Sequence, residues 1–110
     1  MNAIKIKPIS VNKCWQGRRF KTNEYKEYEQ ELMYILPPLV VDPRLDYEVY
    51  LEFGVSNSRQ DIDNPVKPFL DCLQKKYGFD DASIWEMHIK KVKVKKGEEY
   101  IKFEIKEYGE

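Results

Sequence analysis

Alternating apolar and polar side chains mark two strands in the first half of the chain. Residues 3–8 alternate isoleucine with lysine and end on a proline, which predicts a short strand. From Tyr47 to Val55 every odd-numbered position is apolar, and glutamates occupy two of the positions between them. A period of two over this length predicts a half-buried strand.

Two helices are predicted from their spacing and their ends. The first should begin at the threonine–asparagine pair at 22–23 and run to about Ile35, where two prolines follow. The second has clearer ends: Asn64 suits the cap, Pro65 the first helical position and Gly78 the residue after the last turn. Apolar residues at helical spacing define the buried face of this second helix: Val66, Phe69, Leu70 and Leu73.

The C-terminal third of the chain predicts two further strands. Residues 84–94 and 100–105 are rich in alternating apolar side chains and flank a lysine–glycine turn. Between Ile89 and Val92 the apolar residues shift from odd-numbered to even-numbered positions. A bulge is therefore expected near residues 90–91. The predicted order is β-α-β-α-β-β, an α+β fold in which a mixed sheet packs against two helices.

Composition limits the class of protein. With 110 residues the chain fits one domain, which we place at residues 1–110. The net charge is zero, so any contact with nucleic acid must come from local basic patches. No apolar run approaches the length of about 18 residues that suggests a membrane-spanning helix, and the N-terminus lacks the apolar run of a signal peptide. We therefore expect a cytoplasmic protein.

The cysteine and histidine content argues against a zinc site. Cys14 and Cys72 lie far apart in the sequence, and His88 is the single histidine. In a cytoplasmic protein the two cysteines are expected to stay reduced and to pack as small hydrophobic side chains. His88 is expected to be an ordinary strand residue.

Two aspartates just before the second helix are the best candidates for metal binding. Asp61 and Asp63 stand two positions apart, and if their segment is extended their side chains point the same way. Two carboxylates on one side suit magnesium, which usually binds one or two carboxylates and keeps several waters. Taken alone, the two aspartates could also be ordinary turn or capping residues.

Further charged residues accompany this pair. Lys67 lies one helical turn past Asp63, where it could neutralise charge on a phosphate or simply pair with Asp63 and Asp71. A third acidic unit, Asp80-Asp81, follows the helix. Carboxylates and a lysine, with no histidine nearby in the sequence, describe metal-assisted phosphodiester hydrolysis better than histidine-based acid–base chemistry.

This combination resembles the signature of RusA-type endodeoxyribonucleases. That signature is Asp-x-Asp-Asn followed by a lysine, then a helix with an internal aspartate, then a double aspartate after the helix. In this chain the corresponding positions are residues 61–67, Asp71 and Asp80-Asp81. A weaker similarity lies in the N-terminal half, at residues 9–12, Trp15, residues 17–20 and Tyr25.

The resemblance implies a homodimeric, magnesium-dependent enzyme that acts on branched DNA. It would resolve four-way Holliday junctions by paired symmetric nicks in DNA recombination and repair, with Mn²⁺ as an alternative ion. It further implies that Asp61, Asp63 and Asp81 are the catalytic acids and metal ligands and that Lys67 is essential. Before the motif this chain has Ser58-Arg59-Gln60, where the better-known members are more basic.

Chain length adds a geometric argument for a dimer. A helix from Pro65 to Tyr77 is about 20 Å long at about 1.5 Å per residue, whereas the short link from its end to Asp81 reaches at most about 10 Å. One chain therefore has difficulty in bringing Asp81 to the same ion as Asp61 and Asp63. Two antiparallel copies of the helix about a two-fold axis would do so, which predicts a metal site completed across a homodimer.

Candidate DNA contacts lie mainly in the loop after the first strand. Its basic-aromatic patch consists of Trp15, Arg18, Arg19, Phe20 and Lys21. The basic residues could contact phosphates and an aromatic ring could wedge into an opened junction; alternatively, the two aromatic rings fold into the core. Arg59, beside the acidic residues, is a further candidate for a phosphate contact. The lysines between residues 90 and 96 either bind DNA or deter edge-to-edge strand pairing.

Two other functions remain open. The first is a catalytically silent branched-DNA-binding or protein-interaction domain of the same fold, which magnesium-dependent nicking would exclude. The second is an interaction module whose acidic residues only cap helices and bind water. It would show neither metal dependence nor affinity for branched DNA.

Overall fold

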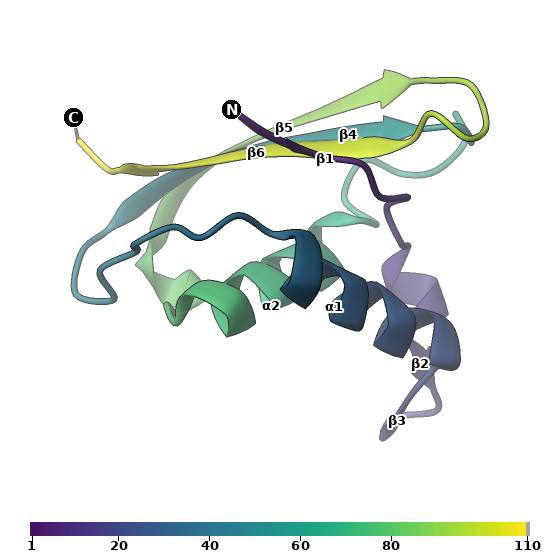
Figure 1. The fold of residues 1–110 in the computed structure, drawn as a ribbon, viewed down its shortest axis with the longest axis horizontal. Coiled ribbons are helices and arrows are strands. Elements are labelled where there is room, and N and C mark those ends of the chain that lie inside the picture. Colours follow the sequence, from purple (N-terminus) through teal and green to yellow (C-terminus); the bar gives the residue numbers. More distant parts are fainter. Residues whose placement is uncertain (110) are drawn as a thin grey trace.

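The computed structural model describes residues 1–109 and consists mainly of a four-stranded mixed sheet with two helices against one face (Figure 1). The strands, in spatial order, are β1 (Asn2–Ile4), β6 (Tyr100–Glu107), β4 (Tyr47–Val55) and β5 (Ile84–Lys93). The helices are α1 (Asn23–Ile35) and α2 (Val66–Tyr77). Shorter elements are the 3₁₀ helices η1 (Val11–Lys13) and η2 (Asp81–Ser83) and a hairpin of β2 (Trp15–Gln16) and β3 (Phe20–Lys21). The predicted α+β fold with a mixed sheet and two helices is confirmed.

Strands β4 and β5 form a parallel pair, and α2 is the crossover between them. A parallel pair needs such a long connection because both of its strands start at the same end of the sheet. The pairs β4–β6 and β1–β6 are antiparallel. The crossover therefore starts with a loop at the carboxyl end of β4 and finishes with a loop at the amino end of β5. These two loops carry the candidate acidic residues.

Aromatic rings fix α2 against the sheet. Phe69 of α2 packs edge-on against Phe53 of β4 and Phe103 of β6, with ring centroids 6.0 and 5.7 Å apart. All three side chains are fully buried, as the alternating pattern of β4 and the helical spacing of α2 predicted. Truncation of a buried aromatic ring to alanine typically costs about 3–5 kcal/mol. This contact therefore holds the loops at both ends of α2 in place.

The ends of the helices agree with the predictions except at the start of α2, where both Asn64 and Pro65 differ from their predicted positions. The hydroxyl of Thr22 accepts a hydrogen bond from the backbone N–H of Tyr25 and caps α1, as expected. Gly78 ends α2 in the left-handed conformation, with a φ of 72°. The expected cap of α2 is wrong, however, because Pro65 occupies the cap position and no side chain caps this helix. The side chain of Asn64 is therefore available for another role.

Two strand predictions also need correction. The first strand ends at Ile4 rather than near residue 8, because the N–H of Ile6 donates back to the carbonyl of Ile4 and the chain turns. The bulge expected near residues 90–91 is wrong as well: pairing of β4 with β5 is irregular at its start, between Tyr47 and Glu48, and continuous from there on. The apolar residues of β5 change from odd-numbered to even-numbered positions for another reason. Val92 pairs with Gly54 of the neighbouring strand β4.

Both cysteines are buried and free, as expected for small hydrophobic side chains. Burial raises the pKa of the Cys14 thiol to about 11 and that of the Cys72 thiol to about 12, so both stay protonated at neutral pH. His88 lies on β5, as predicted. Neither α1 nor α2, the two α-helices of the described chain, combines the length and apolar character needed to cross a membrane.

Candidate active site

The loop between β4 and α2 carries Asp61 and Asp63 in a series of turns. The N–H of Asn64 donates to the carbonyl of Asp61 at 3.2 Å, and the N–H of Val66 donates to the carbonyl of Asp63 at 3.1 Å. The extended conformation considered from the sequence is therefore wrong, and alternation along a strand does not explain the spacing of the two aspartates. Both side chains are exposed, and neither has a hydrogen-bond or ion-pair partner among residues 1–109. Their carboxylates are free to bind a cation.

Two contacts from other elements hold this loop. The ammonium group of Lys91, on β5, donates to the carbonyl oxygens of Ser58 at 3.2 Å and Gln60 at 2.6 Å. On the other side of the loop, the N–H of Val11 donates to the carbonyl of Asn64 at 2.9 Å. Sequence reasoning missed Lys91 and treated it as one surface lysine among several. No signal in the sequence distinguishes Lys91 from the neighbouring lysines, because its contacts depend on the register in which it pairs with Phe53 of β4.

A second group of side chains gathers beside α2. The ammonium group of Lys67 lies 2.8 Å from a carboxylate oxygen of Asp71 and 4.0 Å from one of Asp81. The pairing of Lys67 with Asp71 was one of the predicted alternatives. The hydrogen bond with Asp71 raises the pKa of Lys67, so the side chain remains a cation. Residues from the start of α2 and from beyond its end thus share one patch of surface.

The two aspartates that follow α2 make different contacts. The Asp80 carboxylate accepts a hydrogen bond from the N–H of Ala82 at 2.9 Å and caps η2, and this bond lowers the pKa of Asp80. The N–H of Asp81 donates to the side-chain carbonyl of Gln74 at 2.8 Å, which draws the chain back along α2. The Asp81 carboxylate therefore faces Lys67, whereas that of Asp80 serves the local backbone.

The three candidate aspartates do not form one cluster within a single chain. Among residues 1–109, the only group of three or more potential metal ligands within 4.8 Å of one another is Glu48, Glu86 and His88. Those residues belong to β4 and β5 rather than to the two loops of the crossover. Completion of the site across a dimer therefore stays a prediction. The return of the chain along α2 does bring Asp81 to within 4.0 Å of Lys67.

Comparison with known protein families gives a match over most of the chain. The sequence profile of the family described as Endodeoxyribonuclease RusA matches residues 7–106. The chain belongs to the RusA family. The match begins after β1, stops one residue before the end of β6 and includes both loops of the crossover. A search of the curated proteins gave no match.

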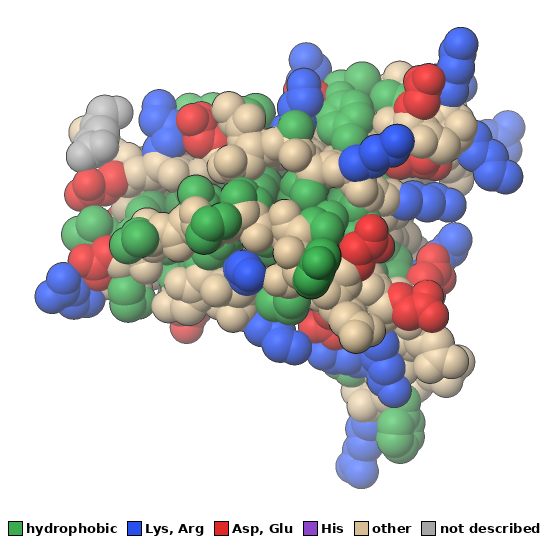
Figure 2. All heavy atoms as spheres, viewed as in Figure 1, with side chains coloured by type: hydrophobic (Ala, Val, Ile, Leu, Met, Phe, Trp, Pro, Cys, Tyr) green, Lys and Arg blue, Asp and Glu red, His purple; other side chains and the backbone are tan. Residues whose placement is uncertain are grey.

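RusA proteins are nucleases that act on branched DNA such as Holliday junctions, so basic surfaces near the acidic loops are of interest. The hairpin of β2 and β3 projects from the body of the molecule (Figure 1), and Figure 2 shows basic and hydrophobic side chains at its tip. Phe20 is 71% exposed and Trp15 is 45% exposed, so the alternative that places both rings in the core is wrong. The Trp15 ring instead rests edge-on against Tyr25, with centroids 6.1 Å apart.

The four basic residues proposed to bind DNA differ in whether they already form an ion pair within the protein. Lys21 is paired with the buried carboxylate of Glu29 at 2.7 Å. The exposed side chains of Arg18, Arg19 and Arg59 have no partner in the described part of the chain. These three arginines can reach a phosphate without breaking an ion pair, whereas Lys21 cannot.

Proposed function

We propose that this RusA protein is a magnesium-dependent endodeoxyribonuclease that resolves Holliday junctions by paired symmetric nicks in DNA recombination and repair. The observation that carries the proposal is the position of Lys67 beside Asp81, next to a loop that presents Asp61 and Asp63 without partners. This set supplies hard oxygen ligands and one cation for a phosphate. We assign the nuclease activity to one domain, residues 1–110, and expect the protein to act in the cytoplasm.

The donor chemistry of the three aspartates fits a magnesium ion, and Mn²⁺ could replace it. Asp61, Asp63 and Asp81 would hold the ion through carboxylate oxygens, which Mg²⁺ prefers over nitrogen or sulfur ligands. A bound ion of this kind lowers the pKa of a water and polarises the phosphate. Lys67 would stabilise the negative charge that builds on the phosphate oxygens, a role for which its raised pKa keeps it protonated.

We further propose that the metal site is completed across a homodimer. Its support is that the three carboxylates do not gather within one chain. Large apolar side chains also remain exposed directly after η2, with Trp85 65% and Met87 36% exposed. Exposed apolar surface of this kind marks protein contacts. A second copy whose α2 runs antiparallel to that of the first about a two-fold axis would bring its own Asp61 and Asp63 towards Asp81 of the first.

Branched DNA would be positioned by the basic residues of the protein. Arg18 and Arg19 on the hairpin would contact backbone phosphates, and Arg59 would contact a phosphate next to the acidic loop. Lys21 would contribute mainly by holding the hairpin against α1 through Glu29. The exposed ring of Phe20 could wedge between bases at the open centre of a junction.

Cleavage of a labelled synthetic four-way junction tests the proposal. Wild type, Asp63→Asn and the control Asp46→Asn are compared in magnesium and in EDTA, with linear duplex as a second substrate. We expect symmetric nicks in the junction alone, lost with EDTA and in Asp63→Asn but kept in Asp46→Asn. Wild-type protein that binds the junction and never cuts it would instead establish the catalytically silent alternative. Protein that neither binds nor cuts would overturn both.

A further inference from the structure

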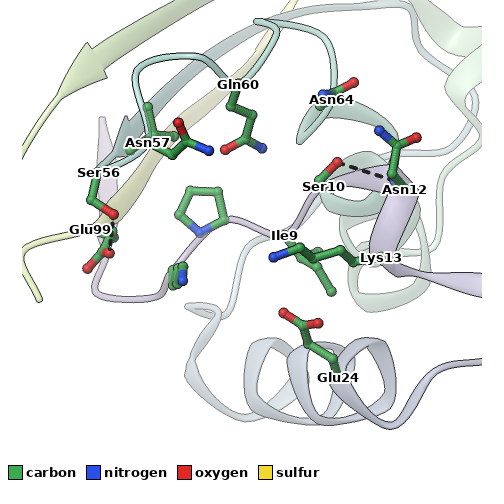
Figure 3. Close-up of a pocket in the computed structure, with 13 residues that line it drawn as sticks. Ile9, Ser10, Asn12, Lys13, Glu24, Ser56, Asn57, Gln60, Asn64 and Glu99 are labelled. Carbon is green, nitrogen blue, oxygen red and sulfur yellow. Dashed lines mark hydrogen bonds between the residues drawn. The ribbon is translucent and has the colours of Figure 1, made fainter. Parts of the chain in front are cut away.

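A pocket of about 310 Å³ opens directly beside the aspartate loop (Figure 3). One wall comes from the segment between β1 and η1, and the other comes from the loop between β4 and α2. Part of its lining is apolar and is formed by Pro8, Ile9 and Val55. The pocket volume is at the lower end of the range for small-molecule sites.

Side-chain amides dominate the polar lining. Gln60 and Asn57 stand on one side of the pocket, and Asn64 and Asn12 stand on the other (Figure 3). The amides of Gln60, Asn64 and Asn12 make no hydrogen bond within residues 1–109, and that of Asn57 only accepts one from the N–H of Arg59. Each free amide offers both donors and an acceptor. The pocket thus combines several side-chain amides that are free to form hydrogen bonds with an apolar part of its lining.

The pocket is continuous with the candidate active site through the chain itself. Gln60 immediately precedes Asp61, and Asn64 immediately follows Asp63. The contacts of Lys91 and Val11 hold this segment on both sides. Asp61 and Asp63 do not themselves line the pocket, so a group bound by the two amides would lie beside the loop that carries the aspartates.

The charged lining of the pocket is balanced and does not single out a phosphate, because it consists of two glutamates and two lysines. Glu24 reaches towards the pocket from α1 (Figure 3), and Glu99 also lines it. Glu99 is occupied by the hydroxyl of Ser56 at 2.8 Å and the N–H of Gly97 at 2.8 Å, but the Glu24 carboxylate has no such partner in the described chain. Lys7 and Lys13 also line the pocket, where they can meet a sugar–phosphate chain.

A nucleobase fits these requirements better than an anion. Its flat faces are apolar, and its edge carries donors and acceptors that asparagine and glutamine amides pair with. Bases at a branch point are more easily unstacked than bases inside a duplex, so placing one in a pocket costs less. We propose that this pocket binds one nucleobase of the strand that is cut, beside the cleaved phosphodiester, and that it makes cleavage depend on the identity of that base. The inference rests on the proposed nuclease function.

Cleavage of a pool of four-way junctions with randomised bases around the branch point tests the pocket. Sequencing of the products gives the base preference at each position for wild type, Gln60→Ala, Asn57→Ala and the control Gln30→Ala. Gln30 is exposed on α1, outside the pocket. We expect a preference at one position beside the cut that falls about five-fold or more in Gln60→Ala and stays unchanged in Gln30→Ala. An even distribution for wild type, or an unchanged preference in both pocket variants, would overturn the inference while the nuclease function stands.

A binding measurement covers the case in which nothing is cut. A junction with 2-aminopurine at the branch point, in calcium, reports unstacking of that base through its fluorescence. We expect the fluorescence to rise with wild type and Gln30→Ala and to rise several-fold less with Gln60→Ala at saturating protein. If wild type never cuts, the nuclease proposal fails and this result alone decides the pocket. Equal increases with wild type, Gln60→Ala and Asn57→Ala would rule the pocket out, and circular dichroism verifies that each variant is folded.

Discussion

The ammonium group of Lys67 lies 4.0 Å from the carboxylate of Asp81, although Lys67 lies in the first turn of α2 and Asp81 lies beyond its last turn. The contact exists because Gly78 turns the chain in the left-handed conformation and Gln74 accepts a hydrogen bond from the N–H of Asp81. Asp71, one turn beyond Lys67, lies 2.8 Å from the same ammonium group. A lysine placed between two carboxylates in this way is well held and remains charged.

Replacement of Lys67 separates a catalytic role from a structural one. An exposed i,i+4 ion pair contributes only about 0.3–0.5 kcal/mol to stability, so Lys67→Met should leave the melting temperature nearly unchanged. Loss of one charge that stabilises a phosphoryl transition state typically costs about 10²–10³ in rate, and we expect a fall of that size in single-turnover cleavage. Lys26→Met, on the exposed surface of α1, is the control. Cleavage by Lys67→Met at the wild-type rate would contradict this role.

Gln74 is expected to act as a positioning residue. Its side-chain carbonyl holds the N–H of Asp81, and its amide N–H lies 3.4 Å from Asp71. Gln74→Ala should let the Asp81 segment move, and loss of a partner that orients a metal ligand typically costs about 10–100-fold in metal affinity or activity. We expect the magnesium concentration for half-maximal cleavage to rise, with partial recovery of the rate at high magnesium. A lower rate at all magnesium concentrations with an unchanged midpoint would assign Gln74 a merely structural role.

Much of the fold could be predicted because local patterns coincide with tertiary burial. The alternation from Tyr47 to Val55 matches β4 at both ends, and Thr22 caps α1 as expected. Asn64 shows where local rules stop, because a cap residue and a pocket-lining residue look the same in sequence. Its side chain faces the pocket, and no side chain caps α2.

The candidate site depends on distances between residues, and the spacing of residues in the sequence sets only an upper limit on those distances. Chain length gives the maximum reach of the segment before Asp81, but its actual path depends on a hydrogen bond from Gln74. The role of Lys91 was missed for a related reason. A bulge expected near residues 90–91 obscures which face this side chain occupies, whereas continuous register pairs it with Phe53.

Lys91 gives a direct test of how strongly the aspartate loop must be held. Lys91→Met removes both hydrogen bonds to the carbonyls of Ser58 and Gln60 while keeping most of the side-chain length. We expect faster hydrogen exchange at the amides of the loop and a slower cut, since a misplacement of about 1 Å near reacting groups can cost about 10²-fold. Lys90→Met, the neighbouring residue without such contacts in the described chain, is the control. Equal exchange in the two variants would show that Val11 alone is enough to hold the loop.

The hairpin of β2 and β3 is expected to provide affinity for DNA through its two free arginines. Each lysine or arginine that neutralises a phosphate releases counterions, so the slope of log K against log salt falls by about one for each contact removed. The double variant Arg18→Ala/Arg19→Ala should therefore bind a four-way junction more weakly and show a salt slope smaller by about two. Arg44→Ala is the control, because that arginine is exposed and already paired with Asp42 at 2.9 Å. An unchanged slope in the double variant would mean that the hairpin does not touch the DNA backbone, and the basic side chains around Arg59 would then be the next surface to alter.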